Sequence, residues 1–299
     1  MKIVEGKTAF ITGGGSGVGF GMAQVFAEAG MKVVIADIRQ DHLDQAMAHF
    51  AGTNHAIHAI RLDVTDRTAF AAAADEAEKV FGKVHLVCNN AGINLFNDMG
   101  KSTYDDWDWV LGVNLGGVVN GVQTFIERIK THGEGGHIVN TASMAAFIAG
   151  PGAGIYTASK FAVRGLSEAL RYSLAPHNIG VSVLCPGLVK SHIYESDKIR
   201  PEALLVNASK APDAFMERLA AVHDAGMDPV EVGKKVLKGV KANDLYIFPH
   251  PEFKEELAEI FDEALQAIPV EDAPAERFQF EEGRRAAKKQ AKAGWKDVG

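Results

Sequence analysis

The chain has 299 residues, of which 47% are hydrophobic and 23% are charged, and its formal net charge is -7. This composition is ordinary for a globular protein, and the length suffices for one large α/β domain. The acidic balance argues against nucleic acid as the main partner. The two cysteines, Cys88 and Cys185, stand far apart in apolar runs, so we expect buried free thiols. No Cys-x-x-Cys or His-Glu-x-x-His pattern occurs, so no metal site is expected.

The N-terminus passes from Met1 through Lys7 straight into an apolar strand, which leaves no room for a signal peptide. Two stretches, 110–126 and 137–159, lack formal charge. Both are interrupted by Gly, Asn and Ser, so neither is expected to span a membrane. We therefore expect a soluble, cytoplasmic protein.

The first apolar strand, 8–12, runs into a glycine-rich turn and then into a helical pattern that continues to about Gly30. Strand, turn and helix together favour a dinucleotide site, because glycines admit a pyrophosphate and the helix N-terminus offers N–H groups. A glycine cluster alone could be only a flexible turn. The spacing here is Thr-Gly-x-x-x-Gly-x-Gly. The candidate cofactor residues of this turn are Gly13, Ser16, Gly17, Val18 and Gly19.

A second strand, 32–37, ends in Asp37, about 20 residues after the glycines, where a dinucleotide fold places a carboxylate. Asp37 can accept hydrogen bonds from ribose hydroxyls and would repel a 2′-phosphate, which favours NAD over NADP. Arg39 opposes this preference, because a guanidinium could pair with a 2′-phosphate. We expect NAD, with NADP as the alternative.

The next segments alternate between expected helices, 41–50 and 68–81, and expected strands that begin at His58 and Val84. This order predicts a parallel sheet with helices on both faces. Ligands then bind beyond the carboxyl ends of the strands. The residues at those ends that we expect to contact the cofactor are Asp63, Val64, Asn90 and Gly92.

Tyr156 and Lys160 are spaced i, i+4, so they share one face of the helix expected at 156–175. A tyrosine phenol has a pKa of about 10, and an ammonium one turn away favours the phenolate and lowers that pKa. Such a tyrosine suits general acid–base work. The preceding strand, 137–143, ends in Ser143, whose hydroxyl could reach the same substrate oxygen. Taken alone, Tyr-x-x-x-Lys is more often a pair on a helix surface, so the neighbouring motifs decide.

Together these motifs resemble those of the short-chain dehydrogenase/reductase family. They are Thr12-Gly13-x-x-x-Gly17-x-Gly19, Asn89-Asn90-Ala91-Gly92, Asn114, Ser143, Tyr156-x-x-x-Lys160 and Pro186-Gly187. The resemblance implies a Rossmann-type fold that binds a nicotinamide cofactor. It also implies a catalytic tetrad of Asn114, Ser143, Tyr156 and Lys160. Further cofactor contacts implied by it are Tyr156, Lys160, Pro186, Val189 and Ser191, the last a serine where many members have threonine. Asn114 could instead be a polar residue that bonds locally inside a helix.

Several segments resemble more narrowly the Cα-dehydrogenases of bacterial lignin β-aryl ether breakdown, which oxidise a benzylic alcohol with NAD. These segments are 36–44, 103–108, 113–120, 227–233 and 245–248. The resemblance implies NAD-dependent oxidation of a bulky aromatic secondary alcohol. The alternatives are an NADP(H)-dependent reductase of a ketone, steroid or 3-oxoacyl chain, and a non-catalytic dinucleotide sensor. Such sensors commonly lose the base, whereas all four tetrad positions are filled here.

The last third of the chain completes a doubly wound, seven-stranded sheet in residues 1–252. Strands are expected at 181–185 and 245–248, and a helix at 229–241. The connection 188–228 is long enough to form a substrate lid. Residues 253–299 are expected to form a C-terminal extension, with an amphipathic helix at 253–268 and a solvated or frayed basic tail at 284–292.

The loops after the fourth, fifth and sixth strands are expected to build the substrate pocket. They are apolar, with no Lys, Arg, Asp or Glu in 92–97 or 143–159, which suits an apolar alcohol or ketone. A sugar or hydroxy acid would need polar partners. The helices expected at 103–129 and 156–175 carry small residues, and the family usually associates through them, so a homodimer or homotetramer is expected. The expected wall of the pocket consists of Ile93, Phe96, Phe147, Ile148, Ile155, Leu188 and Ile193.

Overall fold

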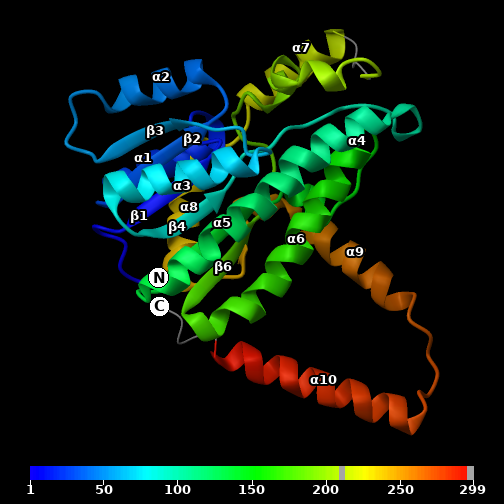
Figure 1. The fold of residues 1–299 in the computed structure, drawn as a ribbon. Coiled ribbons are helices and arrows are strands. Elements are labelled where there is room, and N and C mark those ends of the chain that lie inside the picture. The colour runs from blue at the N-terminus through cyan, green and yellow to red at the C-terminus, as the bar shows by residue number, and fades with distance from the viewer. Residues whose placement is uncertain (209–212, 295–299) are drawn as a thin grey trace.

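A computed structural model describes residues 1–208 and 213–294 of the chain. Its centre is a sheet of seven parallel strands in the order β3-β2-β1-β4-β5-β6-β7 (Figure 1). This confirms the predicted doubly wound α/β fold. The strands are β1 (Thr8–Thr12), β2 (Lys32–Asp37), β3 (Ile57–Arg61), β4 (Val84–Asn89), β5 (Gly136–Thr141), β6 (Ile179–Leu184) and β7 (Tyr246–Ile247).

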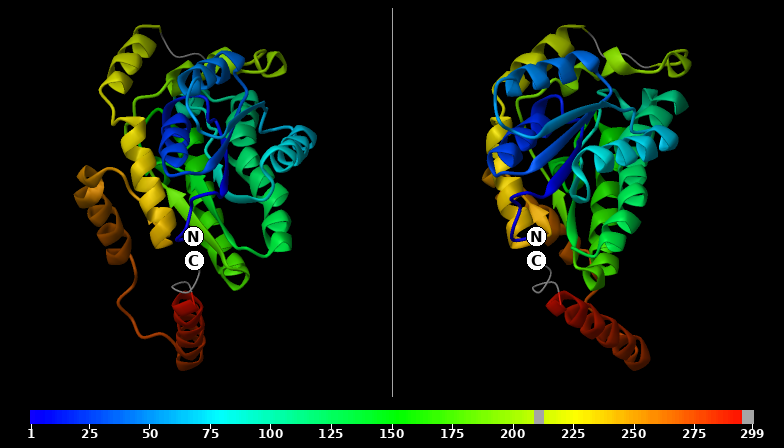
Figure 2. Two further views of the ribbon diagram at one scale, coloured as in Figure 1. Left: turned by 90° about the vertical axis from the view of Figure 1, so that its left-hand side faces the viewer. Right: turned by 60° about the vertical axis from the view of Figure 1, so that its left-hand side comes forward.

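Helices cover both faces of the sheet, as Figures 1 and 2 show. The central strands β1, β4, β5 and β6 are therefore buried along their whole length, as in other parallel sheets covered on both faces. One face carries α1 (Gly17–Glu28), α2 (Gln40–Phe50) and α8 (Pro229–Ala242). The other face carries α3 (Arg67–Phe81), α4 (Tyr104–Leu111), α5 (Gly117–His132) and α6 (Gly154–Leu174).

The strand order reverses next to β1, which lies between β2 and β4. The connections after β1 and after β4 leave to opposite sides at such a point, and a crevice opens beyond the carboxyl ends of the two strands. Both the glycine turn after β1 and the loop that begins at Asn90 lie at this edge. The topology therefore brings the glycine turn and the loop after β4 together.

The helix expected at 103–129 is confirmed as one helical segment, Tyr104–His132, but it is not a regular α-helix throughout. A π-helical turn, Gly112–Gly116, separates α4 from α5, and α5 continues to His132. Asn114 lies in this turn and is fully buried. Three nearby glycines weaken the regular helix, and π-turns occur often at functional sites.

The connection from β6 to α8 forms short 3₁₀ turns at Ile193–Ile199 and Glu202–Leu204, followed by α7 (Asp213–Asp224). Residues 209–212 of the predicted lid lie outside the described residues. A buried ion pair attaches the first part of the lid to α4: Arg200 Nη2 lies 2.8 Å from Asp106 Oδ1, with side-chain exposures of 1% and 0%. The guanidinium also lies over the ring of Trp109, 4.8 Å from its centroid.

The C-terminal extension consists of α9 (Lys254–Gln266) and α10 (Ala275–Ala293). The predicted amphipathic helix is confirmed, because Leu257 packs against the core while most of α9 is exposed. The basic tail at 284–292 is solvated, as one of the two expected alternatives had it, but it is not frayed: these exposed residues lie within α10, whose Ala, Glu, Lys and Arg content favours helix. Figures 1 and 2 show α10 projecting beyond the body of the molecule.

One described helical segment, Tyr104–His132, is long and apolar enough to cross a membrane. Half of its apolar window is buried within the fold. It packs against α3, α6 and β4, so we interpret it as a core element of the α/β domain.

Candidate active site

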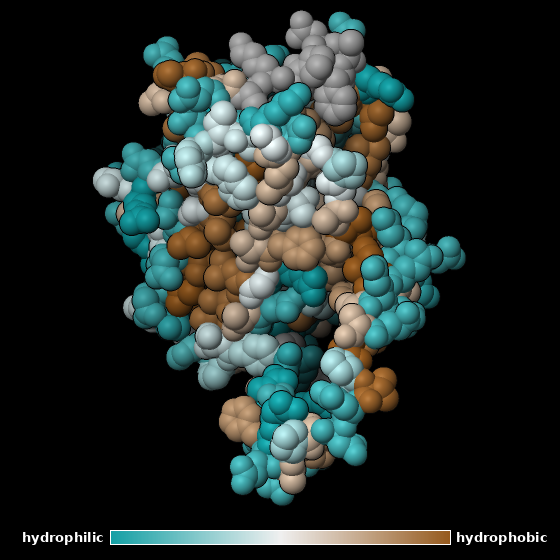
Figure 3. All heavy atoms as spheres, turned by 90° about the vertical axis from the view of Figure 1, so that its right-hand side faces the viewer, coloured by the Kyte–Doolittle hydropathy of each residue, from teal (hydrophilic) through white to brown (hydrophobic). Residues whose placement is uncertain are grey.

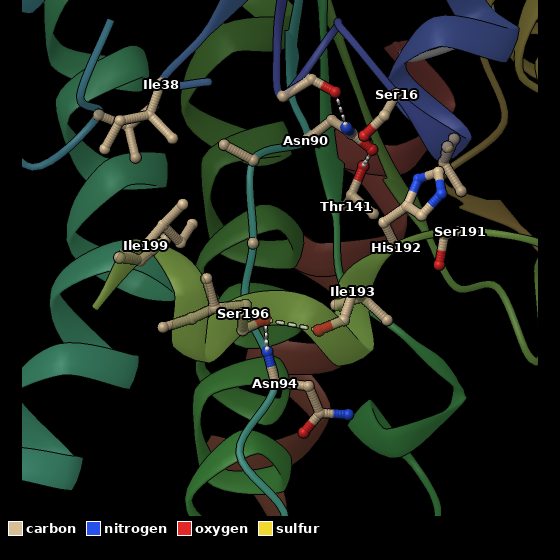
Figure 4. A pocket seen from close by; sticks show the side chains of 18 of the residues that line it. Ser16, Ile38, Asn90, Asn94, Thr141, Ser191, His192, Ile193, Ser196 and Ile199 are labelled. Carbon is tan, nitrogen blue, oxygen red and sulfur yellow. Dashed lines mark hydrogen bonds between the residues drawn. The ribbon is translucent and has the colours of Figure 1, made fainter. Parts of the chain in front are cut away.

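A cavity of about 570 Å³ lies at the carboxyl ends of the strands and beneath the first part of the lid (Figure 4). It is lined by nearly all of the predicted cofactor residues, together with three of the four predicted catalytic ones. Gly19 and Asn114 do not line it; both are buried behind its wall. The predicted residues that line it are Gly13, Ser16, Gly17, Val18, Asp37, Arg39, Asp63, Val64, Asn90, Gly92, Ser143, Tyr156, Lys160, Pro186, Val189 and Ser191.

The N-terminus of α1 fits a pyrophosphate. Ser16 is its N-cap residue, yet its side chain makes no capping hydrogen bond, and the first turn contains no acidic residue. The first N–H groups of a helix have no partner within the helix, and they bind anions well. Gly17 has φ +50°, and a Cβ atom there would lie 3.0 Å from Cβ of Ser191, so a side chain would close this space.

The loop after β4 is fixed to its neighbours by hydrogen bonds. Thr12 Oγ1 accepts from the backbone N–H groups of Asn90 (2.9 Å) and Ala91 (3.1 Å). Asn90 Nδ2 donates to the Thr12 carbonyl at 3.1 Å, and Thr141 Oγ1 donates to Asn90 Oδ1 at 3.2 Å. Figure 4 shows Asn90 and Thr141 joined in this way. Asn90 thus positions the cofactor side of the cavity, with two threonines that the sequence analysis did not select.

Asp37, at the end of β2, is 7% exposed and lines the cavity. Its two oxygens accept from the backbone N–H groups of Gly15 and Arg39, each at 3.0 Å. Burial raises the pKa of Asp37, while these two hydrogen bonds oppose the shift. The backbone therefore fixes the carboxylate in place at the cavity wall.

Ser143, Tyr156 and Lys160 meet on the opposite side of the cavity. Ser143 follows β5, while Tyr156 and Lys160 lie one turn apart on α6. Ser143 Oγ accepts from the Ala145 N–H at 3.1 Å, and its hydroxyl is near enough to the Tyr156 phenol to lower the pKa of that phenol. Lys160 is 3% exposed; its Nζ donates to the Thr141 carbonyl at 3.0 Å and lies 5.4 Å from the centroid of the Tyr156 ring.

The pKa of Tyr156 corrects one expectation. Burial raises it above the usual value of 10.0, and the hydrogen bond to Ser143 is what opposes the rise. Burial also lowers the pKa of Lys160 from 10.5 to about 8. A buried ammonium at this distance therefore does not bring the phenol into the neutral range by itself. The hydroxyl of Ser143 acts on the phenol directly.

Asn114 links three parts of the site from behind the cavity. Its Oδ1 accepts from the Ile93 N–H at 2.8 Å, and its Nδ2 donates to the Ile93 carbonyl and to Ser159 Oγ, both at 3.0 Å. A Cβ atom on Gly92 would lie 3.3 Å from both Asn114 Oδ1 and Lys160 Nζ. A side chain at position 92 would therefore crowd both polar atoms.

The substrate end of the cavity differs from the predicted wall. Ile93, Leu188 and Ile193 line it as expected, but Phe96, Phe147, Ile148 and Ile155 do not. Phe147 instead packs beneath the Arg164 guanidinium, 3.8 Å from its ring centroid, and against Phe248. Ile148 packs on the main core, and Ile155 is buried beside Trp109. The apolar residues that the sequence analysis missed are Trp109, Val113, Ile199, Leu204 and Phe253.

Several polar side chains at the cavity wall were also missed. Four of them come from the lid, where Ser196 accepts a hydrogen bond from the Asn94 N–H at 3.1 Å and donates to the Ile193 carbonyl at 2.6 Å (Figure 4). The i, i+4 spacing of Trp109 and Val113 could have indicated a shared helix face. No local signal marked the lid residues. The polar set is His42, Thr65, Asn94, Asp108, Thr141, His192, Glu195, Ser196 and His223.

Residues 7–201 match the sequence family described as short chain dehydrogenase. The chain belongs to this family. It is 42% identical over 276 residues to a C alpha-dehydrogenase of Sphingobium sp. strain SYK-6, covering 92% of this chain and 90% of the relative. The LigO apo structure from the same strain is 47% identical, with a TM-score of 0.79 over 95% of this chain and 98% of LigO. A short-chain dehydrogenase/reductase from Burkholderia phymatum, solved in complex with NAD, is 35% identical, with a TM-score of 0.84 over 92% of this chain and 100% of that one.

The short-chain dehydrogenase family binds a nicotinamide dinucleotide, and this member is an oxidoreductase of the alcohol dehydrogenase type. One cavity contains both the groups that suit dinucleotide binding and the groups that suit alcohol oxidation. The helix N-terminus and Asp37 lie along one part of its wall, and the hydroxyls of Ser143 and Tyr156 lie along another. When bound, the dinucleotide supplies the hydride acceptor or donor for the substrate carbon.

Replacing Lys160 by methionine should stabilise the protein at neutral pH. The folded-state pKa of about 8 lies below the ordinary 10.5, so between these values the unfolded chain binds more protons than the folded one. Wild-type stability therefore rises with pH in this window. We expect Lys160→Met to raise the free energy of unfolding by about 1–3 kcal/mol at pH 7, with the gain shrinking as pH increases from 8 to 10.5. Urea denaturation of both proteins across this range measures it.

The exposed Lys79, on α3, provides the matched control. Lys79→Met should show no pH-dependent difference from the wild type. A Lys160→Met protein that is less stable than the wild type at every pH would contradict the burial cost, because it would mean that the hydrogen bond to Thr141 outweighs it.

Proposed function

We propose that this short-chain dehydrogenase oxidises a bulky, benzylic secondary alcohol to its ketone with NAD. The observation that carries the proposal is the pairing of one hydroxyl-binding point with an apolar wall. Ser143 and Tyr156 offer the two hydroxyls at that point, while Trp109, Leu188 and Phe253 contribute to the surrounding wall. The C alpha-dehydrogenase relative and LigO support the same assignment. A lignin-derived β-aryl ether alcohol fits this description.

In this proposal Tyr156 exchanges the hydroxyl proton of the substrate, and Ser143 holds the substrate oxygen. Both side chains line the same cavity, and the Ser143 hydroxyl is near enough to lower the pKa of the phenol, so both groups can reach one substrate oxygen. Lys160 is close enough to contribute its positive charge and to bind ribose hydroxyls, and Asn114 holds Gly92 and Ile93 so that a water can connect to Lys160. The dinucleotide accepts the hydride.

NAD is the proposed form of the cofactor. Asp37 lies at the cavity wall with its orientation set by two backbone N–H groups, and a carboxylate in this position suits free ribose hydroxyls and repels a 2′-phosphate. Arg39, which could have favoured NADP, directs its guanidinium to Asp41 and Glu195. The Burkholderia relative was solved with NAD.

Replacing Tyr156 by phenylalanine should lower turnover by about two to four orders of magnitude, because the ring remains and the proton-transfer group is lost. Binding of NADH should change little. Steady-state kinetics and fluorescence titration with NADH measure the two effects. Turnover close to that of the wild type would overturn the catalytic assignment.

A substrate panel tests the reaction itself. It should contain β-aryl ether alcohols, steroid alcohols, simple alkanols and sugars, each assayed with NAD and with NADP. We expect kcat/KM with NAD to be highest for the aromatic alcohols, by at least about a hundredfold over sugars. Fast oxidation of sugars with the aromatic alcohols inert, or fast steroid turnover with NADP alone, would contradict the proposal.

We also propose that residues 188–228 act as the substrate lid.

The protein is further proposed to associate with copies of itself through α5 and α6. The face of the molecule that carries α4, α6 and α9 gathers hydrophobic side chains near its middle (Figure 3). On α6, Phe161 is 42% exposed. Apolar side chains on a helix surface of this kind are typical of contacts between subunits.

Light scattering at micromolar concentration should therefore give a dimer or tetramer. Phe161→Glu should shift the protein toward smaller species, because the interface would bury an unpaired charge. Val80, on α3, is 45% exposed and provides the matched control, so Val80→Glu should leave the mass unchanged. A monomeric wild type would refute the association.

A further inference from the structure

Among the described residues that line the cavity near Asp37, Arg39 is the only lysine or arginine, beside the imidazoles of His42 and His192, and its guanidinium is already engaged. Its Nε donates to Asp41 Oδ1 at 3.0 Å, and Nη2 pairs with the other oxygen of the same carboxylate. Nη1 donates to Glu195 Oε2 at 3.0 Å. A guanidinium has five N–H donors in a fixed fork. The contacts with Asp41 and Glu195 occupy donors on two edges of the Arg39 guanidinium, and a phosphate would need those donors to bind it.

The two acidic partners of Arg39 have different origins. Asp41 is a neighbour in sequence and is 54% exposed, as expected for a local surface pair. Glu195 stands 156 residues away, on the first turn of the lid, and its side chain is 21% exposed. Lys198 bonds to the other oxygen of Glu195 at 2.8 Å and is, with Arg39, the cause that lowers the pKa of Glu195. Glu195 is therefore ionised at neutral pH.

We propose that Glu195 is a determinant of dinucleotide specificity, acting from the lid on the adenosine end of the cofactor site. This inference rests on the proposed preference for NAD. The inference adds that Asp37 alone does not set the preference for NAD over NADP. Glu195 neutralises the one guanidinium that could bind a 2′-phosphate, and Glu195 also places a second carboxylate at the same wall of the cavity. Like charges brought together in this way reject the wrong ligand more than they improve binding of the right one.

The contact between Arg39 and Glu195 also links the preference for NAD or NADP to the position of the lid. Next to Glu195, Ser196 bonds to the Asn94 N–H at the substrate end of the cavity. The same 3₁₀ turn, Ile193–Ile199, thus touches the site of the ribose on one side and the substrate pocket on the other. A 2′-phosphate that took the place of Glu195 at Nη1 would have to displace this turn.

The test compares ADP-ribose with 2′-phospho-ADP-ribose, which probe the adenosine end without catalysis. Isothermal titration should show that Glu195→Gln lowers the ratio of their dissociation constants, Kd(2′-phospho-ADP-ribose) over Kd(ADP-ribose), by about tenfold. The kcat/KM ratio of NAD to NADP should fall in parallel. Glu202→Gln is the matched control, because Glu202 is an exposed lid carboxylate with no side-chain partner among the described residues.

Arg39→Met provides a second, independent variant. If Glu195 already neutralises Arg39 in the wild type, Arg39→Met should change the binding of 2′-phospho-ADP-ribose less than about twofold relative to ADP-ribose. It should also diminish the effect of Glu195→Gln when the two changes are combined. The measurement on the single Arg39→Met variant remains interpretable even if Glu195→Gln folds poorly.

Two results would overturn the inference: an unchanged ratio in a folded Glu195→Gln variant, or selective loss of 2′-phospho-ADP-ribose binding in Arg39→Met. Failure of the NAD proposal has a different signature, because the wild type would then bind 2′-phospho-ADP-ribose more tightly than ADP-ribose. If the protein oxidised none of the alcohols, the proposed substrate class would be contradicted. The dissociation constants of the two ADP-ribose ligands could still be measured, because they do not depend on catalysis.

Discussion

The buried ammonium of Lys160 is the constraint around which the active site is arranged. A cation taken out of water is costly unless polar groups surround it, and no carboxylate among the described residues forms an ion pair with it. The structure supplies a neutral partner instead, the carbonyl of Thr141 at 3.0 Å. Gly92 leaves room beside the ammonium, because a Cβ atom there would lie 3.3 Å from Nζ. The cation thus ties α6 to the end of β5 and restricts the residue at position 92 in the loop after β4.

The lid depends on a second buried charge. Arg200 and Asp106 are almost fully enclosed, and Asp106 also accepts the N–H of Thr103 at 2.9 Å as part of the capping box that starts α4. One carboxylate therefore fixes both the start of a helix and the place where the lid rests on it. Removing either partner would leave an unpaired buried charge, so the lid and α4 are expected to move as a unit.

The sequence predicted those parts of the site whose residues are set by local geometry. Tyr156 and Lys160 are one helical turn apart, and Asp37 terminates a strand, so their neighbourhood follows from spacing. Phe147 was misplaced because an apolar residue in a loop reveals that it is buried but not in which direction, and the Arg164 guanidinium holds its ring away from the cavity. The pairing of Arg39 with Glu195 could not be predicted, since its partners are 156 residues apart and meet only in the folded chain.

Phe253 and His223 line the cavity, although both lie beyond residues 7–201, the part that matches the family. The groups proposed for the chemistry, from Ser143 to Lys160, lie within that part. Ile93, Trp109 and Leu188 of the substrate end lie within the matched part, but Phe253 and His223 add to the wall from outside it. Related dehydrogenases could exchange their C-terminal segments, and so acquire new alcohols, without rebuilding the machinery that transfers the proton and the hydride.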